Sequence, residues 1–211
     1  SLEAQPQPPM QILDATATSL ALPWPELVAA IERTLADAAA GHAHAPDRWV
    51  LPLAERTHAF VMPAWLDATA GDLTAIKLIT YAPDNPERGL PAILGDVLVL
   101  RTSSGERLAL LDGPALTARR TAAVTLHAAR HLAPNPVGPL LVIGTGVQAM
   151  AHVQACTQAL GVDEVWVRGR TAASASTFAQ TLHQQGVYAE VATDLQAALD
   201  ANPEAAEFFA T

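Results

Sequence analysis

Short apolar runs alternate with longer amphipathic segments in the second half of the chain, and this alternation predicts a parallel α/β sheet. The pattern predicts strands over residues 140–143, 165–167 and 187–191, and helices over residues 147–160, 172–185 and from about Leu195. A parallel sheet of three strands is half of a complete doubly wound α/β sheet. We therefore expect the chain to be a fragment or a shortened homologue of a longer protein.

The first half has a different pattern, in which one helix precedes a series of apolar strands. Pro25 at the start and Gly41 past the end delimit this helix. Its apolar face, which we expect to cover a sheet, consists of Leu27, Val28, Ile31 and Leu35. Strands are predicted over residues 49–53, 59–62, 75–81, 93–100 and 107–111. Because residues 103–106 have the composition of a hairpin turn, we expect an α+β fold with a mainly antiparallel sheet.

An alanine-rich segment, residues 115–132, predicts a long helix between the two halves. Residues 133–139 are rich in proline and interrupt that helix. We place the domain boundary there, so that residues 1–134 form the α+β domain and residues 135–211 form the α/β domain.

A glycine turn directly follows the strand at residues 140–143. Gly144 permits a tight turn, Gly146 lets the backbone approach a pyrophosphate, and the small Ala149 lets the next helix pack on the strand. The N-terminus of that helix offers N–H groups and a positive dipole to phosphates. This order of strand, turn and helix predicts the first part of a Rossmann-type dinucleotide site, made of Gly144, Thr145, Gly146, Val147, Gln148 and Ala149.

The end of the next strand indicates which dinucleotide binds. An NAD enzyme usually carries an acidic residue there for the ribose 2′-hydroxyl, but this chain has Arg168, Gly169, Arg170 and Thr171. Guanidinium groups present a fork of donors that matches phosphate oxygens. We therefore predict that these four residues bind the 2′-phosphate of NADPH, and the alternative is that both arginines are solvated loop charges.

Composition limits the range of partners. The net charge is −9 without a basic cluster, which argues against nucleic acid and anionic membranes as partners. Cys156 is the only cysteine, so we predict a buried structural thiol and a cytoplasmic location. No apolar run has the length of a membrane span, and the polar, proline-rich start does not resemble a signal peptide. Because the chain starts at Ser1 and not at Met, we expect a processed first residue.

Eight short motifs, in this order and spacing, resemble those of the ornithine cyclodeaminase/mu-crystallin family. The motifs are Asp47–Trp49, Val61–Pro63, Ile76–Leu78, Gly89–Pro91, Leu111–Gly113, Leu116–Ala123, Gly144–Ala149 and Arg170–Thr171. The resemblance implies a dimerisation and substrate domain followed by a nucleotide domain, with the last part of the chain returning to the first domain. It also implies a homodimer.

By this resemblance Arg48, Lys77 and Arg120 line the pocket and bind a substrate carboxylate, and Arg120 and Thr121 are also assigned to the cofactor. Fixed cations suit an anionic substrate in a cleft of low dielectric constant. The alternatives are that Arg48 pairs with Asp47 or Glu55, and that Lys77 guards an edge strand against aggregation. Arg119 points about a quarter-turn away from Arg120, which predicts a surface charge.

The catalytic acid or base remains unknown, because the family's aspartate lies in a part of the nucleotide domain beyond this chain. His127 and His131 are four residues apart on a helix, but Ala128 occupies the place where a zinc-protease motif has glutamate. His42 and His44 lie in a loop with no acidic cluster nearby in the sequence, and the other histidines, His58, His152 and His183, are isolated. We predict no metal.

The resemblance implies NADPH-dependent reduction of a cyclic ketimine acid, Δ1-pyrroline-2-carboxylate or Δ1-piperideine-2-carboxylate, to proline or pipecolate. One alternative is an ornithine or lysine cyclodeaminase, which releases ammonia without net consumption of cofactor. A second alternative is a non-catalytic protein that binds NADPH and a ligand, as in mu-crystallin.

Overall fold

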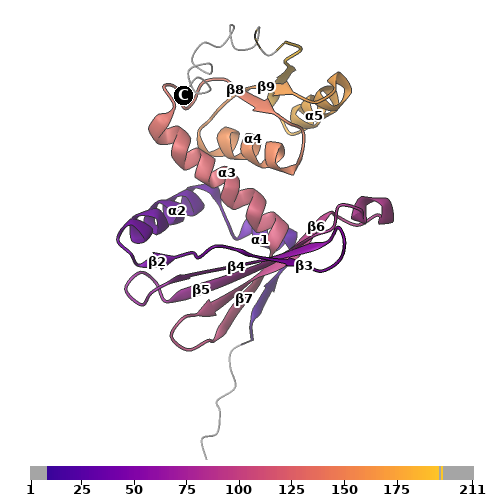
Figure 1. Ribbon diagram of the computed structural model, residues 1–211. Coiled ribbons are helices and arrows are strands. Elements are labelled where there is room, and N and C mark those ends of the chain that lie inside the picture. The colour runs from indigo at the N-terminus through magenta and orange to yellow at the C-terminus, as the bar shows by residue number, and fades with distance from the viewer. Residues whose placement is uncertain (1–8, 195, 197–211) are drawn as a thin grey trace, which may run out of the picture. The chain divides into compact units, whose positions relative to one another are not determined.

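The computed structural model describes residues 9–194 and 196 and divides into two compact units (Figure 1). Unit 1 contains the residues up to Pro23 together with Glu32–Thr117. Unit 2 contains Trp24–Ile31 together with the chain from Ala118 onward. The chain therefore contributes to unit 2 twice, at two places far apart in the sequence.

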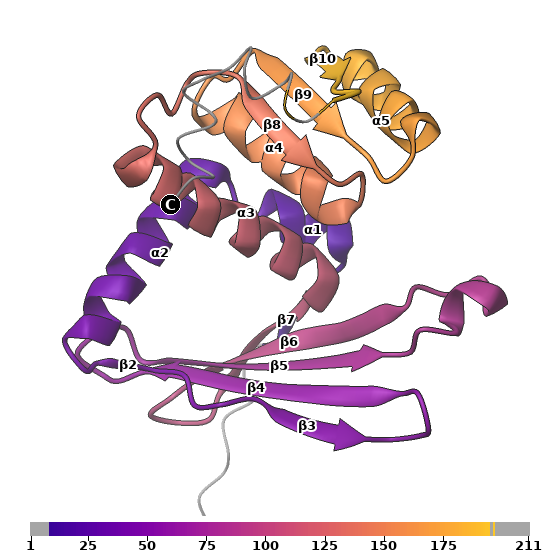
Figure 2. The same ribbon diagram turned by 45° about the horizontal axis from the view of Figure 1, so that its top comes forward.

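Unit 1 is built on a seven-stranded sheet with the order β1-β7-β6-β5-β4-β2, in which β3 also pairs with β4. The strands are β1 (Gln11–Leu13), β2 (Ala43–His44), β3 (Trp49–Pro52), β4 (His58–Leu66), β5 (Leu73–Tyr81), β6 (Ile93–Arg101) and β7 (Arg107–Asp112). Figure 2 shows β3, β4, β5 and β6 side by side. All pairs are antiparallel except β1 with β7, which confirms a mainly antiparallel sheet.

Short helices complete unit 1. Helix α1 (Ala15–Leu20) is capped by Asp14, whose carboxylate accepts a hydrogen bond from the N–H of Ala17 at 2.8 Å. The fully buried Thr18 accepts from the N–H of Asp112 and donates to the carbonyl of Leu13, so its hydroxyl joins α1 to the sheet. A 3₁₀ turn, η1 (Asn85–Arg88), connects β5 to β6.

Two glycines bring the start of helix α3 (Gly113–Leu132) directly onto the sheet. Gly95 has a φ of +145°, and a Cβ there would lie 2.0 Å from the carbonyl oxygen of Leu78. A Cβ at Gly113 would lie 2.7 Å from the carbonyl oxygen of Gly95. Only glycine fits such close backbone contacts, so both positions fix how the helix leaves the sheet.

Unit 2 contains a three-stranded parallel sheet with the order β10-β9-β8. Its elements are β8 (Leu140–Ile143), α4 (Val147–Ala159), β9 (Glu164–Arg168), α5 (Ala172–Gln184) and β10 (Tyr188–Val191). Strands and helices alternate along the chain, as in half of a Rossmann-type sheet. This confirms the α/β class predicted for the second half.

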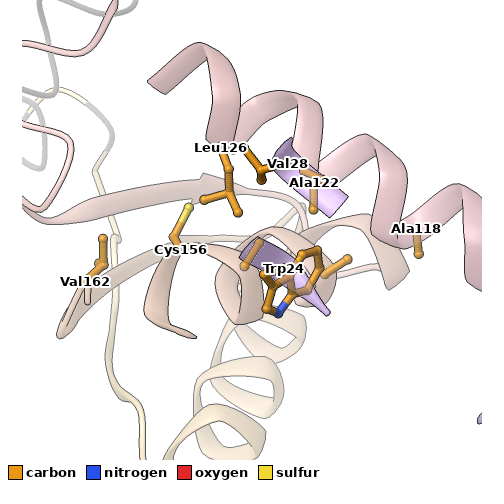
Figure 3. Packing of buried hydrophobic residues seen from close by; sticks show 10 residues of the cluster. Trp24, Val28, Ala118, Ala122, Leu126, Cys156 and Val162 are labelled. Atoms are coloured by element: carbon orange, nitrogen blue, oxygen red, sulfur yellow. The ribbon is translucent and has the colours of Figure 1, made fainter. Parts of the chain in front are cut away.

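Two apolar clusters form the core of unit 2. The first (Figure 3) joins Trp24 and Val28 of helix α2 (Trp24–Ala39) to residues of α3 and α4, with Ala122, Ala155 and Leu126 completely buried. The second lies between the sheet and α5 and includes Val165, Val167 and Leu182. Val28 of the predicted apolar face thus packs with residues of α3 and α4, so the prediction that this face covers a sheet is wrong for Val28.

The other predicted elements agree with the structure to within four residues at each end. The pattern missed α1, η1 and the short strands β1 and β2, and the helix predicted from about Leu195 lies outside the described residues. The domain boundary predicted at residue 134 stays a prediction. The compact units divide after Pro23, after Ile31 and after Thr117. In the described part of the chain, no helix combines the length and the apolar character needed to cross a membrane.

Candidate functional site

The glycine turn lies between β8 and α4, and its geometry suits a bound phosphate group. Gly144 has a φ of +124°, which favours glycine, and its N–H donates to the carbonyl of Arg168 at 2.8 Å. Gly146 is the N-cap of α4 and provides no side-chain cap. A Cβ at either glycine would meet no atom within 4 Å, so the backbone there faces open space. The first-turn N–H groups of α4 can therefore donate to a pyrophosphate in that space.

The second part of the candidate site lies at the end of the neighbouring strand. Because β8 and β9 are parallel neighbours, their carboxyl ends meet at the same edge of the sheet. The segment Arg168–Thr171 begins with the last residue of β9 and lies at this edge, beside the glycine turn. The structure therefore brings together the two motifs that the sequence assigns to the dinucleotide.

The side chains of this segment have different environments. Nη1 of Arg168 donates to the carbonyl oxygens of Ala192 and Thr193, at 3.3 Å for Ala192. Thr171 is the N-cap of α5, and its hydroxyl accepts from the N–H of Ser174 at 3.1 Å. Arg170 is exposed, so its guanidinium is accessible to a ligand.

Gly169 lets this loop pack against the first turn of α5. A Cβ there would lie 2.7 Å from Oγ of Ser174 and 2.9 Å from the N atom of Ala175. The tight loop fixes the backbone on both sides of it and hence the place where Arg170 leaves the sheet edge.

In unit 1, Arg48 and Lys77 lie on one face of the sheet. Lys77 of β5 pairs with Met62 of β4, and the guanidinium of Arg48 lies 5.5 Å from the ring centroid of Phe60, two residues before Met62. Residues two apart on a strand share a face. The two cations therefore belong to the same surface of unit 1. Arg120 lies in unit 2, so the convergence of all three cations stays a prediction.

The structure excludes the alternative in which Lys77 protects an edge strand against aggregation. Strand β5 lies between β4 and β6 and is not at the edge of the sheet, so Lys77 does not guard an edge. The Arg48 guanidinium contacts an aromatic ring, and among the described residues it forms no ion pair with Asp47 or Glu55.

The neighbours Arg119 and Arg120 on α3 differ in their surroundings. Arg120 is exposed, whereas the guanidinium of Arg119 lies 3.8 Å from the ring centroid of Trp24. Burial against this ring lowers the pKa of Arg119. The prediction that Arg119 is a surface charge is wrong, because α2 supplies a cation–π partner from a distant part of the sequence.

Two histidines, His42 and His152, hydrogen-bond to side chains far away in the sequence. The ring of His183, expected to be isolated, accepts from the N–H of Ala189 at 3.1 Å. His42 Nδ1 lies 2.9 Å from the carboxylate of Asp67 and 3.1 Å from the hydroxyl of Thr69. Hydrogen bonds from Thr69 and then from His42 lower the pKa of Asp67 to about 2. Both groups contact the same ring nitrogen, so this trio is not the relay of a catalytic triad, in which the hydroxyl and the carboxylate use different nitrogens. His152 contacts Gln148 and Thr125; its spacing of four residues from Gln148 could have indicated the first contact.

Metal-binding residues do not gather in the described part of the chain, where no three His, Cys, Asp or Glu side chains are placed to hold an ion. Cys156 is buried as predicted, and burial raises the pKa of its thiol to about 11. A thiol with this pKa is a poor nucleophile at neutral pH.

The other face of the sheet in unit 1 exposes large apolar side chains. Strand register places them together on the face opposite Lys77. The members are Ile12, Trp49, Leu51, Trp65, Leu78 and Leu94, each at least 37% exposed. We call these six residues the apolar face. An apolar face of this extent is typical of an interface.

Curated relatives of the chain include pyrroline-2-carboxylate reductases and ketimine reductases. The chain is 42% identical over 167 residues to Delta(1)-pyrroline-2-carboxylate reductase 1 of Burkholderia multivorans, covering 79% of this chain and 52% of the relative. It is 36% identical over 138 residues to the ketimine reductase mu-crystallin of Mus musculus, covering 65% of this chain and 44% of that protein. The chain thus spans about half the length of the curated relatives that it matches.

Solved structures with the same fold include the Delta(1)-pyrroline-2-carboxylate reductase of Thermococcus litoralis in complex with NADH and L-proline. The two are 25% identical with a TM-score of 0.76, over 90% of this chain and 58% of that one. An archaeal alanine dehydrogenase dimer with bound NAD is 26% identical with a TM-score of 0.74, over 87% of this chain and 56% of the other. A sequence model of the ornithine cyclodeaminase/mu-crystallin family matches residues 10–202, so the chain belongs to this family.

Proposed function

We propose that the protein reduces a cyclic ketimine acid with NADPH, taking Δ1-pyrroline-2-carboxylate or Δ1-piperideine-2-carboxylate to proline or pipecolate. The observation that carries this proposal is the open glycine turn at the same sheet edge as Arg170, in a chain that is 42% identical to a Δ1-pyrroline-2-carboxylate reductase. The residues of this edge fit a dinucleotide.

The nucleotide half of the proposed site uses backbone donors and one exposed cation. The first turn of α4 binds the pyrophosphate through its N–H groups. Arg170 binds the 2′-phosphate with its fork of donors, and Arg168 contributes the donors that its two carbonyl contacts leave. The bound nicotinamide supplies the hydride for reduction.

The substrate half uses cations that hold the carboxylate. Arg48 and Lys77 share one face of the sheet in unit 1, and we infer that Arg120 completes the group. A carboxylate held by several donors is fixed in orientation as well as in place, so its imine carbon can be presented to the cofactor. The residue that protonates the imine nitrogen is not assigned among the described residues.

Product analysis separates this proposal from its rivals. With the complete protein, NADPH and Δ1-pyrroline-2-carboxylate, we expect one NADPH to be oxidised for each proline formed. Release of ammonia from ornithine or lysine without net oxidation of NADPH would instead identify a cyclodeaminase. Tight binding of NADPH without either reaction would identify a binding protein.

We also propose that the protein is a cytoplasmic homodimer. Its apolar face on the sheet of unit 1 supports a dimer interface, since six large apolar side chains in contact with water are costly. Among the neighbours of known structure, the alanine dehydrogenase is described as a dimer. The single, buried cysteine is consistent with a reducing compartment.

A further inference from the structure

A polar link joins helices α3 and α4 of unit 2 through the ring of His152. Nδ1 of His152 lies 2.7 Å from the carbonyl oxygen of Gln148, in the first turn of α4. Nε2 lies 3.0 Å from the hydroxyl of Thr125 on α3. The same hydroxyl lies 3.3 Å from the carbonyl oxygen of Thr121. The link therefore reaches from the helix that follows the glycine turn to the middle of the neighbouring helix.

Hydrogen-bond chemistry fixes the tautomer of the ring. The carbonyl of Gln148 can only accept, so Nδ1 of His152 carries a hydrogen. In the neutral ring Nε2 is then an acceptor. The Thr125 hydroxyl has one hydrogen, and we assign it to Nε2 at 3.0 Å, the nearer of its two acceptors, and not to the Thr121 carbonyl at 3.3 Å. With both nitrogens engaged, the ring has one defined orientation.

The apolar contacts between these helices do not provide the same directionality. The cluster in Figure 3 packs Ala122 and Leu126 of α3 with Ala155 and Cys156 of α4. Apolar burial is non-directional, and three of these four side chains are small. The hydrogen bonds of His152 add a defined alignment at the end of α4 that faces the glycine turn.

We propose that His152 is a positioning residue for dinucleotide binding. It holds the first turn of α4, whose N–H groups face the phosphates, in alignment with the segment of α3 that carries Arg120 and Thr121. This inference rests on the proposed function of the glycine turn. Loss of the link leaves the fold intact but lets the two helices shift against each other, so the cofactor is bound less tightly.

Amide side chains separate the two halves of the link. The side-chain amide atoms of Asn are separated from Cα by the same number of bonds as Nδ1 of histidine. Those of Gln are separated from Cα by the same number of bonds as Nε2. His152→Gln keeps an acceptor for Thr125, whereas His152→Asn keeps only the contact with Gln148. Thr125→Val removes the donor from the other side, and Thr125→Ser restores a hydroxyl.

We expect the dissociation constant for NADPH to rise about three- to tenfold in His152→Asn and in Thr125→Val, the range for one lost hydrogen bond. His152→Gln and Thr125→Ser should stay within about twofold of the wild type. In the double variant His152→Asn/Thr125→Val the dissociation constant for NADPH should be no higher than in either single variant, because both substitutions remove the same hydrogen bond. The matched control is Thr157→Val: the Thr157 hydroxyl donates to the Val153 carbonyl at 2.9 Å within α4 and makes no cross-helix link.

Two readouts distinguish positioning from a general loss of stability. In the complete enzyme KM for NADPH should rise while KM for the imine acid is unchanged, and kcat should fall less than KM rises. Histidine ¹⁵N spectra at pH 8 should show the Nδ1–H tautomer of His152 without any cofactor present.

An Nε2–H tautomer overturns the inference, as do unchanged NADPH affinities in His152→Asn and Thr125→Val when the wild type binds NADPH. A lower unfolding temperature with unchanged affinity also overturns it, because this result is expected of a purely structural contact. If the wild-type enzyme binds no NADPH, the proposed function fails first, and the positioning role fails with it.

Discussion

Arg170 is exposed just beyond the end of β9, where we propose that the 2′-phosphate of NADPH binds. Arg170→Ala should weaken NADPH binding by about 1–3 kcal/mol, the range for a charge-assisted hydrogen bond, and should affect NADH much less, because NADH has no 2′-phosphate. Dissociation constants for both cofactors measure the difference. Arg130→Ala is the control, since Arg130 is exposed on α3 and donates to the carbonyl of Ala159 at 3.4 Å. Equal losses for the two cofactors would remove Arg170 from the 2′-phosphate site.

Lys77 is the only lysine of the chain and occupies an interior strand of the sheet. Lys77→Ala should raise KM for the ketimine acid and also lower kcat, because a carboxylate with fewer partners is held both weakly and loosely. Steady-state rates with saturating NADPH test this in the complete enzyme. Arg107→Ala removes an exposed cation on β7, which β6 separates from β5, and should leave both constants unchanged. Unaltered kinetics in Lys77→Ala would show that Lys77 has a structural role only.

Local sequence predicted those residue properties that depend on near neighbours. The glycine turn and the buried thiol of Cys156 follow from the surrounding apolar pattern, and the structure confirms the turn and the burial. The contact of Arg119 with Trp24 joins positions 95 apart, and the contact of His152 with Thr125 joins positions 27 apart. The periodicity of apolar residues does not predict such contacts, because they form only when helices distant in the sequence pack together.

At the scale of elements, Gly95 controls how β5, β6 and the start of α3 come together. Gly95→Ala should destabilise the protein by more than about 4 kcal/mol, because its Cβ would overlap the Leu78 carbonyl and because a φ of +145° disfavours any side chain. Gly105→Ala is the matched control: its φ of +69° costs about 1–2 kcal/mol, but its Cβ would meet no atom within 4 Å. Urea unfolding gives both values, and similar losses at the two glycines would argue against the backbone contact.

Element positions were predictable where a strand or helix was long enough to show its period. The strand at residues 140–143 and the helix α3 are examples. Strands β1 and β2 contain three and two residues, and α1 contains six. These lengths are shorter than the run of about 4–8 residues that shows a strand period or of about 11 that shows a helix period. Their existence depends on partners such as β7, which holds β1 in parallel register.

At the scale of the whole molecule, the apolar face predicts self-association. The wild type should have twice the mass of one chain by light scattering at micromolar concentration. Leu78→Glu should yield a monomer, because Leu78 is 48% exposed near the middle of this face and a buried carboxylate there would have no partner. Leu132→Glu, at the end of α3 and 72% exposed, is the control and should remain dimeric. A wild-type monomer would rule out the proposed interface.

The extent of each compact unit was the least accessible property in the sequence. Proline and glycine after residue 133 mark the end of a helix, which is a local event. The units depend instead on what the helices pack against: α3 from Ala118 onward shares a core with α4, and Trp24 completes it through a hydrogen bond of its indole to Gln158 at 3.0 Å. The residues that separate such partners along the sequence do not indicate that the partners will pack together.

The return of the chain to unit 2 has a consequence for its synthesis. Residues 24–31 emerge from the ribosome about 90 residues before Ala118. At about 5–20 residues per second this interval lasts roughly 4–18 s. During it Trp24 and Val28 lack every partner from α3 and α4, whereas strands β2 to β7 are all completed. Translation thus favours an order of folding in which the antiparallel sheet forms first and unit 2 later packs around residues 24–31, which were made long before.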